Sequence, residues 1–214
     1  MQFAPTETWE MMILVGGIGW ISRKGYGCVK KSLRIDSGEA PAVPQRQEVF
    51  LHPFDNFGRL DPISKMTAYA VALALKDAGI SYPLGRKQDI GIIGTNSGGC
   101  IDSDIRYFKD YLDSGRTLSR GNLFIYTLPS SPLSEAAIHF GLQGPLFYTS
   151  GTGMAETLNM AAEIIHTDEA AIMLAGMAEE GAAAYFVLSK GDCFPDGNLG
   201  EVSQNVVTRF IGCV

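Results

Sequence analysis

Residues 144–158 read GPLFYTSGTGMAETL. An apolar run from Pro145 to Tyr148 meets a short turn of threonine, serine and glycine, and an apolar helical pattern begins near Met154. This order predicts a strand, a turn and a helix, an arrangement in which enzymes hold a nucleophile at a helix N-terminus, where unpaired backbone N–H groups stabilise negative charge. No cysteine stands in the turn. The stretch is therefore a site with another nucleophile, a site that has lost its nucleophile, or only a tight turn.

Composition narrows the class of protein. The 214 residues suffice for one sizeable domain with a buried core, and 46% of them are hydrophobic. The formal net charge of −6 argues against nucleic acid or an anionic membrane as the main partner. The longest uncharged apolar run, residues 170–178, is too short to cross a bilayer. We expect a single domain over residues 1–214, without a membrane segment.

The cysteines and histidines support neither a disulfide framework nor a metal site. No cysteine pair has C-x-x-C spacing, and no histidine has a second histidine or cysteine three or four residues away. These residues are Cys28, Cys100, Cys193, Cys213, His52, His139 and His166. Acidic rather than basic residues precede the first apolar segment, unlike a secretory leader. We expect a cytoplasmic protein with reduced thiols that binds no metal and no cofactor.

Hydrophobic periodicity predicts a layered α/β domain. The clearest helix lies in SKMTAYAVALALKDAGI, because Asp61 can cap it, Pro62 suits its first position and Gly79 suits its end. Strands are predicted in IGIIG, AAIMLAGMA and AAAYFVLS, and a charged helix is predicted after TNSGG. Only residues 179–181 separate the last two strands, so we expect an antiparallel pair. Residues 23–34 are expected to form a basic loop after a strand and a glycine-rich bend.

Two other glycine-rich stretches are weaker candidates for chemistry. GTNSGG, residues 94–99, approaches a nucleophile elbow around Ser97, but Thr95 stands where the elbow needs glycine. His139 or His166 would have to serve as its base, and His139 reads better as a packed core residue. GGIGWIS, residues 16–22, lacks the third glycine of a dinucleotide-binding fingerprint and reads better as a strand that bends under a neighbour.

The segment before the opening turn, IHFGLQGP, resembles the F-G-L-x-G-P signature that precedes the active-site turn of β-ketoacyl synthases, the condensing enzymes of fatty-acid and polyketide synthesis. Four further segments resemble elements of that family in the family's order: SKMTAYAVALALKDAGI its first long helix, IGIIGTNSGG a strand and glycine turn, IMLAGMAEE a strand ending in Ala-Gly-Gly-x-Glu, and AAAYFVLSKG a Val-Leu strand. The resemblance implies the thiolase fold, an α/β layered architecture, and covers the N-terminal of its two similar halves.

The resemblance fails at the nucleophile. In the synthases a cysteine at this turn carries the acyl chain as a thioester. Matching Thr149 to the family's threonine places Gly151 at the cysteine position, and counting without a gap from the Gly-Pro pair places Gly153 there. A hydroxyl without an adjacent base is a poor nucleophile, and the family's two catalytic histidines belong to its other half. The resemblance therefore implies no catalytic residue and a degenerate nucleophile turn made of Ser150, Gly151, Thr152 and Gly153.

Members of the family without the cysteine exist as partners of active synthases, and those called chain-length factors shape the pocket in which the acyl chain grows. The resemblance thus implies a non-catalytic subunit or modulator, rather than a 3-oxoacyl-[acyl-carrier-protein] synthase active on its own. Two alternatives stay open: a serine hydrolase or acyltransferase that uses Ser97 or Ser150, and a truncated remnant without function.

The resemblance also suggests partner surfaces. In the family, the strand before the turn lies at the sheet edge and pairs with its counterpart in the partner. We therefore expect a homodimer, or a heterodimer with a full-length synthase, through Leu146, Phe147, Tyr148 and Thr149. The helices around residues 136–140 and 154–165 are expected to offer the partner an apolar face. The basic loop, with Lys30 and Lys31, is a candidate docking site for an acidic acyl carrier protein.

Overall fold

The computed structural model describes residues 12–36, 44–116, 120–191 and 193–201. A mixed sheet of seven strands runs through this part of the chain in the order β3-β2-β1-β7-β6-β4-β5. The strands are β1 (Ile13–Ser22), β2 (Gly25–Cys28), β3 (Leu33–Asp36), β4 (Ile90–Asn96), β5 (Leu146–Ser150), β6 (Ile172–Glu179) and β7 (Ala182–Lys190). The helices are α1 (Arg46–Val49), α2 (Pro62–Ala78), α3 (Ile101–Asp113), α4 (Gly121–Phe124), α5 (Ser131–Phe140) and α6 (Met154–His166), with 3-10 turns η1 (Phe57–Arg59) and η2 (Ile125–Thr127).

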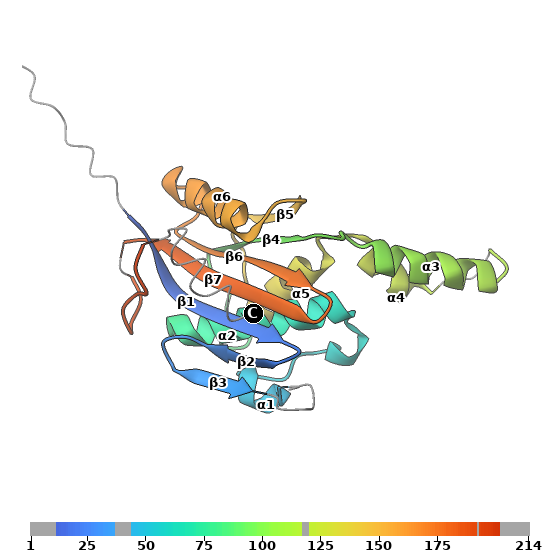
Figure 1. Ribbon diagram of the computed structural model, residues 1–214, viewed down its shortest axis with the longest axis horizontal. Helices are drawn as coiled ribbons and strands as arrows, with labels where there is room; N and C mark the ends of the chain where they lie inside the picture. The colour runs from blue at the N-terminus through green and yellow to red at the C-terminus, as the bar shows by residue number, and fades with distance from the viewer. Residues whose placement is uncertain (1–11, 37–43, 117–119, 192, 202–214) are drawn as a thin grey trace, which may run out of the picture.

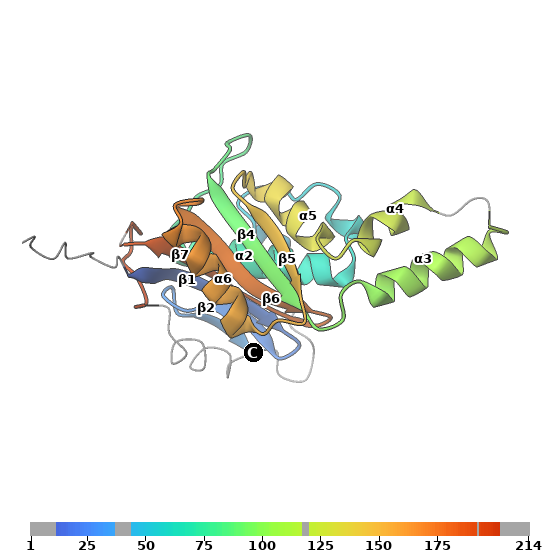
Figure 2. The same cartoon turned by 90° about the horizontal axis from the view of Figure 1, so that it is seen from above.

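Helices cover both faces of the sheet (Figure 1). Helices α2 and α5 lie on one face, and α6 lies on the other. Helices α3 and α4 form an arm that projects from the layered body, as both views show (Figures 1 and 2). The α/β layered architecture predicted from the alternating patterns is confirmed.

Helix α2 has the boundaries that its sequence predicts. The Asp61 side chain accepts a hydrogen bond from the Ser64 N–H at 2.8 Å, and Gly79 ends the helix with a φ of +73°. The helix lies so close to β1 that a Cβ at Gly17 or Gly19 would come within 2.4 Å of its backbone. The glycine-rich stretch is therefore the site of close helix–strand contact. This agrees with the prediction that it is a strand beneath a neighbouring element, not a dinucleotide-binding fingerprint.

A buried carboxylate joins α2 to the strands. Asp77, which is fully buried, accepts hydrogen bonds from the Ile18 N–H at 2.9 Å and from the Lys31 N–H at 3.0 Å. Burial, with Asp77 nearby, also raises the pKa of the Cys28 thiol to about 11. Cys28 is therefore a neutral core residue.

Strands β6 and β7 pair antiparallel around the turn at residues 180–181, which confirms the predicted pair. Strand β4 runs parallel to both β5 and β6. The carboxyl ends of these three parallel strands consequently lie at one edge of the sheet, where loops of α/β proteins carry their sites.

One sequence-based expectation about local structure is wrong, because the stretch predicted as a basic loop contains the antiparallel strands β2 and β3. The predicted glycine-rich bend lies within β1, where the pairing with β7 is irregular between Val15 and Gly17. Helices α5 and α6 bury Ala136 and Ala161 in the core and expose Ile138 and Met160, so the apolar face that they were expected to offer a partner stays a prediction. The outward side of α6 carries Glu156, Asn159 and Glu163.

Candidate functional site

The opening turn lies at the carboxyl edge of the parallel strands. Strand β5 ends at Ser150, directly beside Asn96 at the end of β4. The Tyr148 hydroxyl donates to the Asn96 Oδ1 at 2.9 Å, and Asn96 also closes the β4 turn through two hydrogen bonds with the Gly99 backbone. The structure thus brings together the two glycine-rich turns that the sequence marks as candidates for chemistry.

The two glycines at the candidate nucleophile position differ in backbone conformation. Gly151 has a φ of +73°, in the left-handed region, where side chains are strained. Gly153 is extended, with a φ of −83° and a ψ of 169°, and is the residue from which α6 begins. An added Cβ would meet no heavy atom within 4 Å at either position. A side chain therefore fits at Gly153 without strain, directly at the helix N-terminus.

The threonines of the turn are bound to one another. The Thr152 hydroxyl lies 2.7 Å from that of Thr149, 3.1 Å from that of Thr95 and 3.4 Å from that of Thr157. The Thr95 hydroxyl also donates to the Thr152 carbonyl at 3.2 Å. This network ties the turn to β4 and α6, so Thr152 acts as a structural anchor. No pattern in the sequence predicted this threonine network, because Thr95, Thr149 and Thr157 belong to three separate elements.

A carboxylate occupies the helix N-terminus. The Glu156 Oε2 accepts a hydrogen bond from the Gly153 N–H at 3.3 Å. In an enzyme this backbone donor would be available to a developing oxyanion. In this chain the Glu156 carboxylate already accepts the hydrogen bond from the Gly153 N–H, and it adds negative charge where a thiolate or oxyanion would form.

The histidines lie away from the turn. His166 ends α6, whereas the turn precedes the first residue of that helix, roughly 20 Å away at 1.5 Å per residue. His139 lies near the end of α5, before β5 begins, and stacks on Phe54 with ring centroids 3.9 Å apart. Its buried Nε2 has no hydrogen-bond partner in the described chain. Burial, and to a smaller extent the charge of the neighbouring His52, lower the pKa of His139 to about 4. His139 is packed against aromatic rings, as predicted, but it is only partly buried and lies at the margin of the core.

Ser97 and Cys100 lie in the turn between β4 and α3, and both take part in hydrogen bonds. The Ser97 N–H donates to the Glu179 Oε1 at 2.6 Å, and no histidine of the described chain faces the serine. The Cys100 thiol, which no motif of the sequence marks as reactive, donates to the Thr127 carbonyl at 2.9 Å. Burial and the neighbouring Asp104 raise the pKa of Cys100, so the thiol stays neutral.

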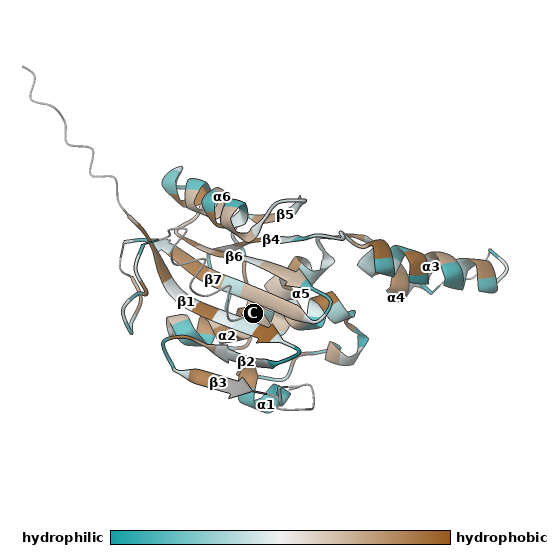
Figure 3. Ribbon diagram, in the orientation of Figure 1, coloured by the Kyte–Doolittle hydropathy of each residue, from teal (hydrophilic) through white to brown (hydrophobic). Residues whose placement is uncertain are grey.

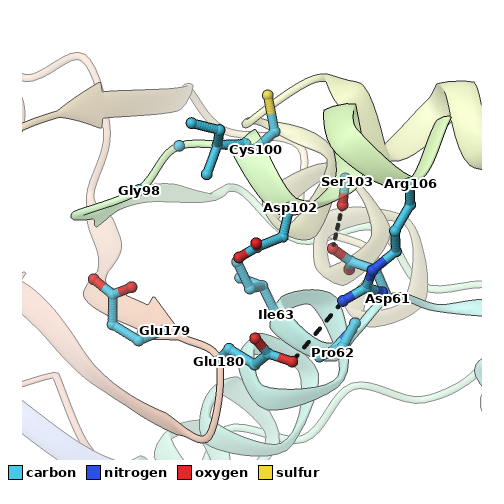
Figure 4. Close-up of a pocket in the computed structure, with 12 residues that line it drawn as sticks. Asp61, Pro62, Ile63, Gly98, Cys100, Asp102, Ser103, Arg106, Glu179 and Glu180 are labelled. Atoms are coloured by element: carbon cyan, nitrogen blue, oxygen red, sulfur yellow. Dashed lines mark hydrogen bonds and ion pairs between the residues drawn. The ribbon is translucent and has the colours of Figure 1, made fainter. Parts of the chain in front are cut away.

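A small pocket lies beside these turns (Figure 4). It is formed by the N-terminal ends of α2 and α3 and by the β6–β7 turn, and its volume is about 60 Å³. Asp61, Asp102, Glu179 and Glu180 line it, and Arg106 lies 3.9 Å from Glu180. This volume holds only a few water molecules, well below the roughly 300 Å³ of a small-ligand pocket. Among the described residues, no group of His, Cys, Asp and Glu is placed to hold a metal ion.

The lysines expected to dock a carrier protein are engaged within the chain. Lys30 Nζ donates to the Gly197 carbonyl at 2.7 Å and lies 5.8 Å from the Phe194 ring centroid. Lys31 Nζ pairs with Asp196 at 2.5 Å. Both charges help to hold the segment at residues 194–197, so they are less available to a partner than the sequence suggested. Their role in docking stays a prediction.

Strand β5 is the outermost strand at its end of the sheet, as predicted, and in the described chain it pairs only with β4. Its sequence LFYTS contains no charge, and Phe147 is 43% exposed. An unpaired, uncharged strand edge is a template for pairing with another chain. None of the helices in the described chain has the length and apolarity that a membrane crossing requires.

The sequence matches no protein-family model and no curated protein. Its structure is similar to solved structures. A β-ketoacyl synthase from Burkholderia phymatum STM815 superposes with a TM-score of 0.66 at 18% identity, over 85% of this chain and 59% of that chain. The chain has the ketosynthase fold. This outcome confirms the thiolase-type fold and the family resemblance proposed from the sequence.

Two further ketosynthase-fold structures come from complexes with chain length factors. The ishigamide ketosynthase/chain length factor gives a TM-score of 0.64 at 15% identity, over 84% of this chain and 62% of that chain. A ketosynthase (ApeO) in complex with its chain length factor (ApeC) from Xenorhabdus doucetiae gives 0.57 at 14% identity, over 85% and 80%. This chain spans about three fifths of the length of the first two structures. At these identities the likeness shows the ketosynthase fold alone.

Proposed function

We propose that this chain is a non-catalytic ketosynthase-like subunit or modulator, comparable to a chain length factor, in fatty-acid or polyketide acyl chain synthesis. The observation that carries the proposal is a ketosynthase fold whose nucleophile turn holds Gly151 and Gly153 instead of a cysteine. Similar structures that contain a chain length factor support the comparison.

The chemistry of the turn supports a non-catalytic role. Thr152 is held by three other threonine hydroxyls, and Glu156 occupies the Gly153 N–H. Ser150 is exposed and has no histidine beside it in the described chain, and a hydroxyl without a base is a poor nucleophile at neutral pH. The turn retains the shape of a catalytic elbow and lacks both a nucleophile and a base.

The proposed partner is a full-length ketosynthase, or a second copy of this chain, that pairs with the free edge of β5 at residues 146–149. The open edge and the half-exposed Phe147 support this choice, because pairing would satisfy the backbone and cover the ring. A structure of a type II polyketide acyl-carrier protein in complex with its ketosynthase is also similar to this chain. We include acyl carrier protein as a transient partner of the assembled complex.

Acyl transfer tests the catalytic half of the proposal. Incubation with a radiolabelled acyl carrier protein thioester should leave no stable acyl group on the chain, and a fluorophosphonate probe should not label it. The control is a ketosynthase with an intact cysteine, which should become acylated. A stoichiometric acyl adduct on Ser150 or Thr152 would overturn the proposal, and probe labelling at Ser97 or Ser150 would favour a serine hydrolase or acyltransferase.

Binding tests the partner half. The chain should co-purify with a ketosynthase encoded in the same gene cluster, and Phe147→Asp should weaken that complex. Leu84→Asp is the matched control, because Leu84 is an apolar residue between α2 and β4 and is 81% exposed. A chain that neither carries acyl groups nor binds a ketosynthase would fit the truncated remnant instead.

A further inference from the structure

A groove lies at the edge of the sheet opposite the nucleophile turn. Its two walls are the loop before β4, at residues 83–87, and the end of α5 with the loop that follows it, at residues 137–143. Figure 2 shows the loop before β4 beside the end of α5, where β4 and β5 begin. The volume of the groove is about 360 Å³, within the roughly 300–1,000 Å³ of small-ligand sites.

Backbone contacts hold the two walls of the groove together. The Gln88 N–H donates to the Gly141 carbonyl at 2.7 Å, and the Gln88 side chain donates to the Phe140 carbonyl at 3.1 Å. The Gln143 N–H donates to the Gln88 carbonyl at 2.8 Å. Gly141 has a φ of +68°, and a Cβ there would come within 2.2 Å of the Arg86 carbonyl oxygen. The groove is therefore part of the folded framework and does not need a ligand to form.

Each wall of the groove exposes a large apolar side chain. Leu84 is 81% exposed and Ile138 is 79% exposed, the two highest values among the large hydrophobic residues of the described chain. Figure 3 shows other hydrophobic residues on the projecting arm of α3 and α4, and these two lie apart from that arm. Ala137 and Leu142 also line the groove. The lining therefore offers apolar surface to a ligand from both walls.

The lining of the groove is positively charged, although the chain has a formal net charge of −6. Arg86 and Lys87 line it, and no aspartate or glutamate does. Neither cation forms an ion pair with another residue of the described chain. His139 also lines the groove, and its buried Nε2 has no hydrogen-bond partner among the described residues. The groove therefore carries two cationic groups and an unpaired nitrogen that an anion could use.

The carboxyl end of α5 opposes an anion only weakly. A helix C-terminus carries a partial charge of about −0.5, which arises from its unpaired carbonyl groups. Two of these carbonyls are already hydrogen-bonded, that of Ala137 by the Leu142 N–H at 2.9 Å and that of Phe140 by the Gln88 side chain. Two full positive charges outweigh this partial charge, so the groove favours an anionic ligand.

We propose that this groove binds a fatty-acid carboxylate, with the head group at Arg86 and Lys87 and the hydrocarbon chain between Leu84 and Ile138. A guanidinium binds a carboxylate through two parallel hydrogen bonds, and the ammonium adds a second charge. The hydrocarbon chain removes the two exposed side chains from water. A neutral apolar ligand would leave the cations unpaired, and a short anion would leave the apolar walls uncovered. A single-chain amphiphile with an anionic head satisfies both.

The inference goes beyond the proposed function and does not rest on it. The groove lies where β4 and β5 begin, whereas the nucleophile turn lies where these parallel strands end. Two variants separate the proposals. Leu84→Asp should lose the carboxylate and keep the ketosynthase, and Phe147→Asp should lose the ketosynthase and keep the carboxylate.

Isothermal titration calorimetry of the full chain with decanoate, below its micelle concentration, provides the first test. We expect one site per chain with a Kd on the order of 100 μM, which corresponds to a modest ligand efficiency for a molecule of about twelve non-hydrogen atoms. Octanoate should bind about fourfold more weakly, because it lacks two methylenes that an open groove half covers. Acetate and decyltrimethylammonium should not bind. Equal binding of decanoate and decyltrimethylammonium would overturn the proposal.

Charge reversal locates the head group. Arg86→Glu and Lys87→Glu should each raise the decanoate Kd roughly tenfold, because each replaces an attraction by a repulsion. Lys24→Glu is the matched control, since Lys24 is an exposed lysine between β1 and β2, and it should leave the Kd unchanged. Circular dichroism verifies that every variant is folded. A wild-type Kd in both folded groove variants would show that the cations do not hold the ligand.

Amide NMR spectra of the full chain identify the site directly. Decanoate should shift the signals of residues 83–87 and 137–143 and leave those of residues 154–166 unchanged. Shifts confined to other residues would overturn the proposal. Tighter binding of decyl phosphate than of decanoate would assign the groove to a phosphate and overturn the choice of a carboxylate. Acyl carrier protein that shifts these signals where decanoate does not would assign the groove to an acidic protein instead.

Discussion

The same substitution at Gly151 and at Gly153 should have opposite effects on stability. Both glycines lie in the turn before α6, and a Cβ added at either one would have no heavy atom within 4 Å, so steric overlap does not distinguish them. Only the backbone does. Gly151 has a φ of +73°, whereas Gly153 has a φ of −83° and precedes the first residue of the helix.

The expected magnitudes follow from these angles. Serine at residue 151 must adopt the left-handed conformation, which costs about 1 kcal/mol. Serine at residue 153 keeps its preferred extended conformation and gains an N-cap oxygen for the Glu156 N–H, which stabilises the helix by about 0.5 kcal/mol. For a chain of this size the difference of about 1.5 kcal/mol corresponds to about 3–6 °C in Tm.

Differential scanning calorimetry of Gly151→Ser and Gly153→Ser measures this difference, with urea denaturation as a second probe. The Gly153→Ser variant should melt above the wild type and Gly151→Ser below it. Equal Tm values, or a lower Tm for Gly153→Ser, would refute the assignment of residue 153 as the unstrained position for a side chain at the helix N-terminus.

Three other predictions concern reactivity, pH and packing. A cysteine introduced by Gly153→Cys should react slowly with iodoacetamide, and adding Glu156→Gln should speed the reaction about tenfold, because the carboxylate no longer caps the helix or raises the thiol pKa; equal rates would contradict this role. Burial lowers the pKa of His139 to about 4 from an ordinary 6.5, so the ring stays neutral in the folded protein while the unfolded chain becomes protonated, and stability declines as the pH falls from 6.5 to 4. Urea denaturation should show a loss of about 2 kcal/mol over this range that His139→Phe abolishes; an unchanged slope in the variant would count against it. Gly19→Ala places a Cβ 2.2 Å from the backbone of α2 and should cost about 3 kcal/mol in the free energy of unfolding, whereas Gly58→Ala, with open space around it, should be nearly neutral; similar Tm values for both variants would argue against the close contact.

Local signals in the sequence were enough to predict the elements that depend on near neighbours. Helix α2 begins after Asp61 and ends at Gly79, as predicted, because a cap and a helix end involve residues only a few positions apart. The β6–β7 pair also follows from its short turn. The sequence also predicted glycine at the nucleophile position, Gly151 or Gly153, from an ordered set of motifs around the turn, and this assignment stays a prediction.

Only the tertiary structure shows which residues contact elements that are distant in the sequence. The sequence predicted α3 as a charged helix but does not show which of its residues are covered, because burial depends on elements distant in sequence. The contacts of Lys30 and Lys31 with residues 194–197 join segments more than 160 positions apart, which no local pattern encodes. The threonine network around Thr152 likewise exists only because β4, β5 and α6 meet at one edge of the sheet.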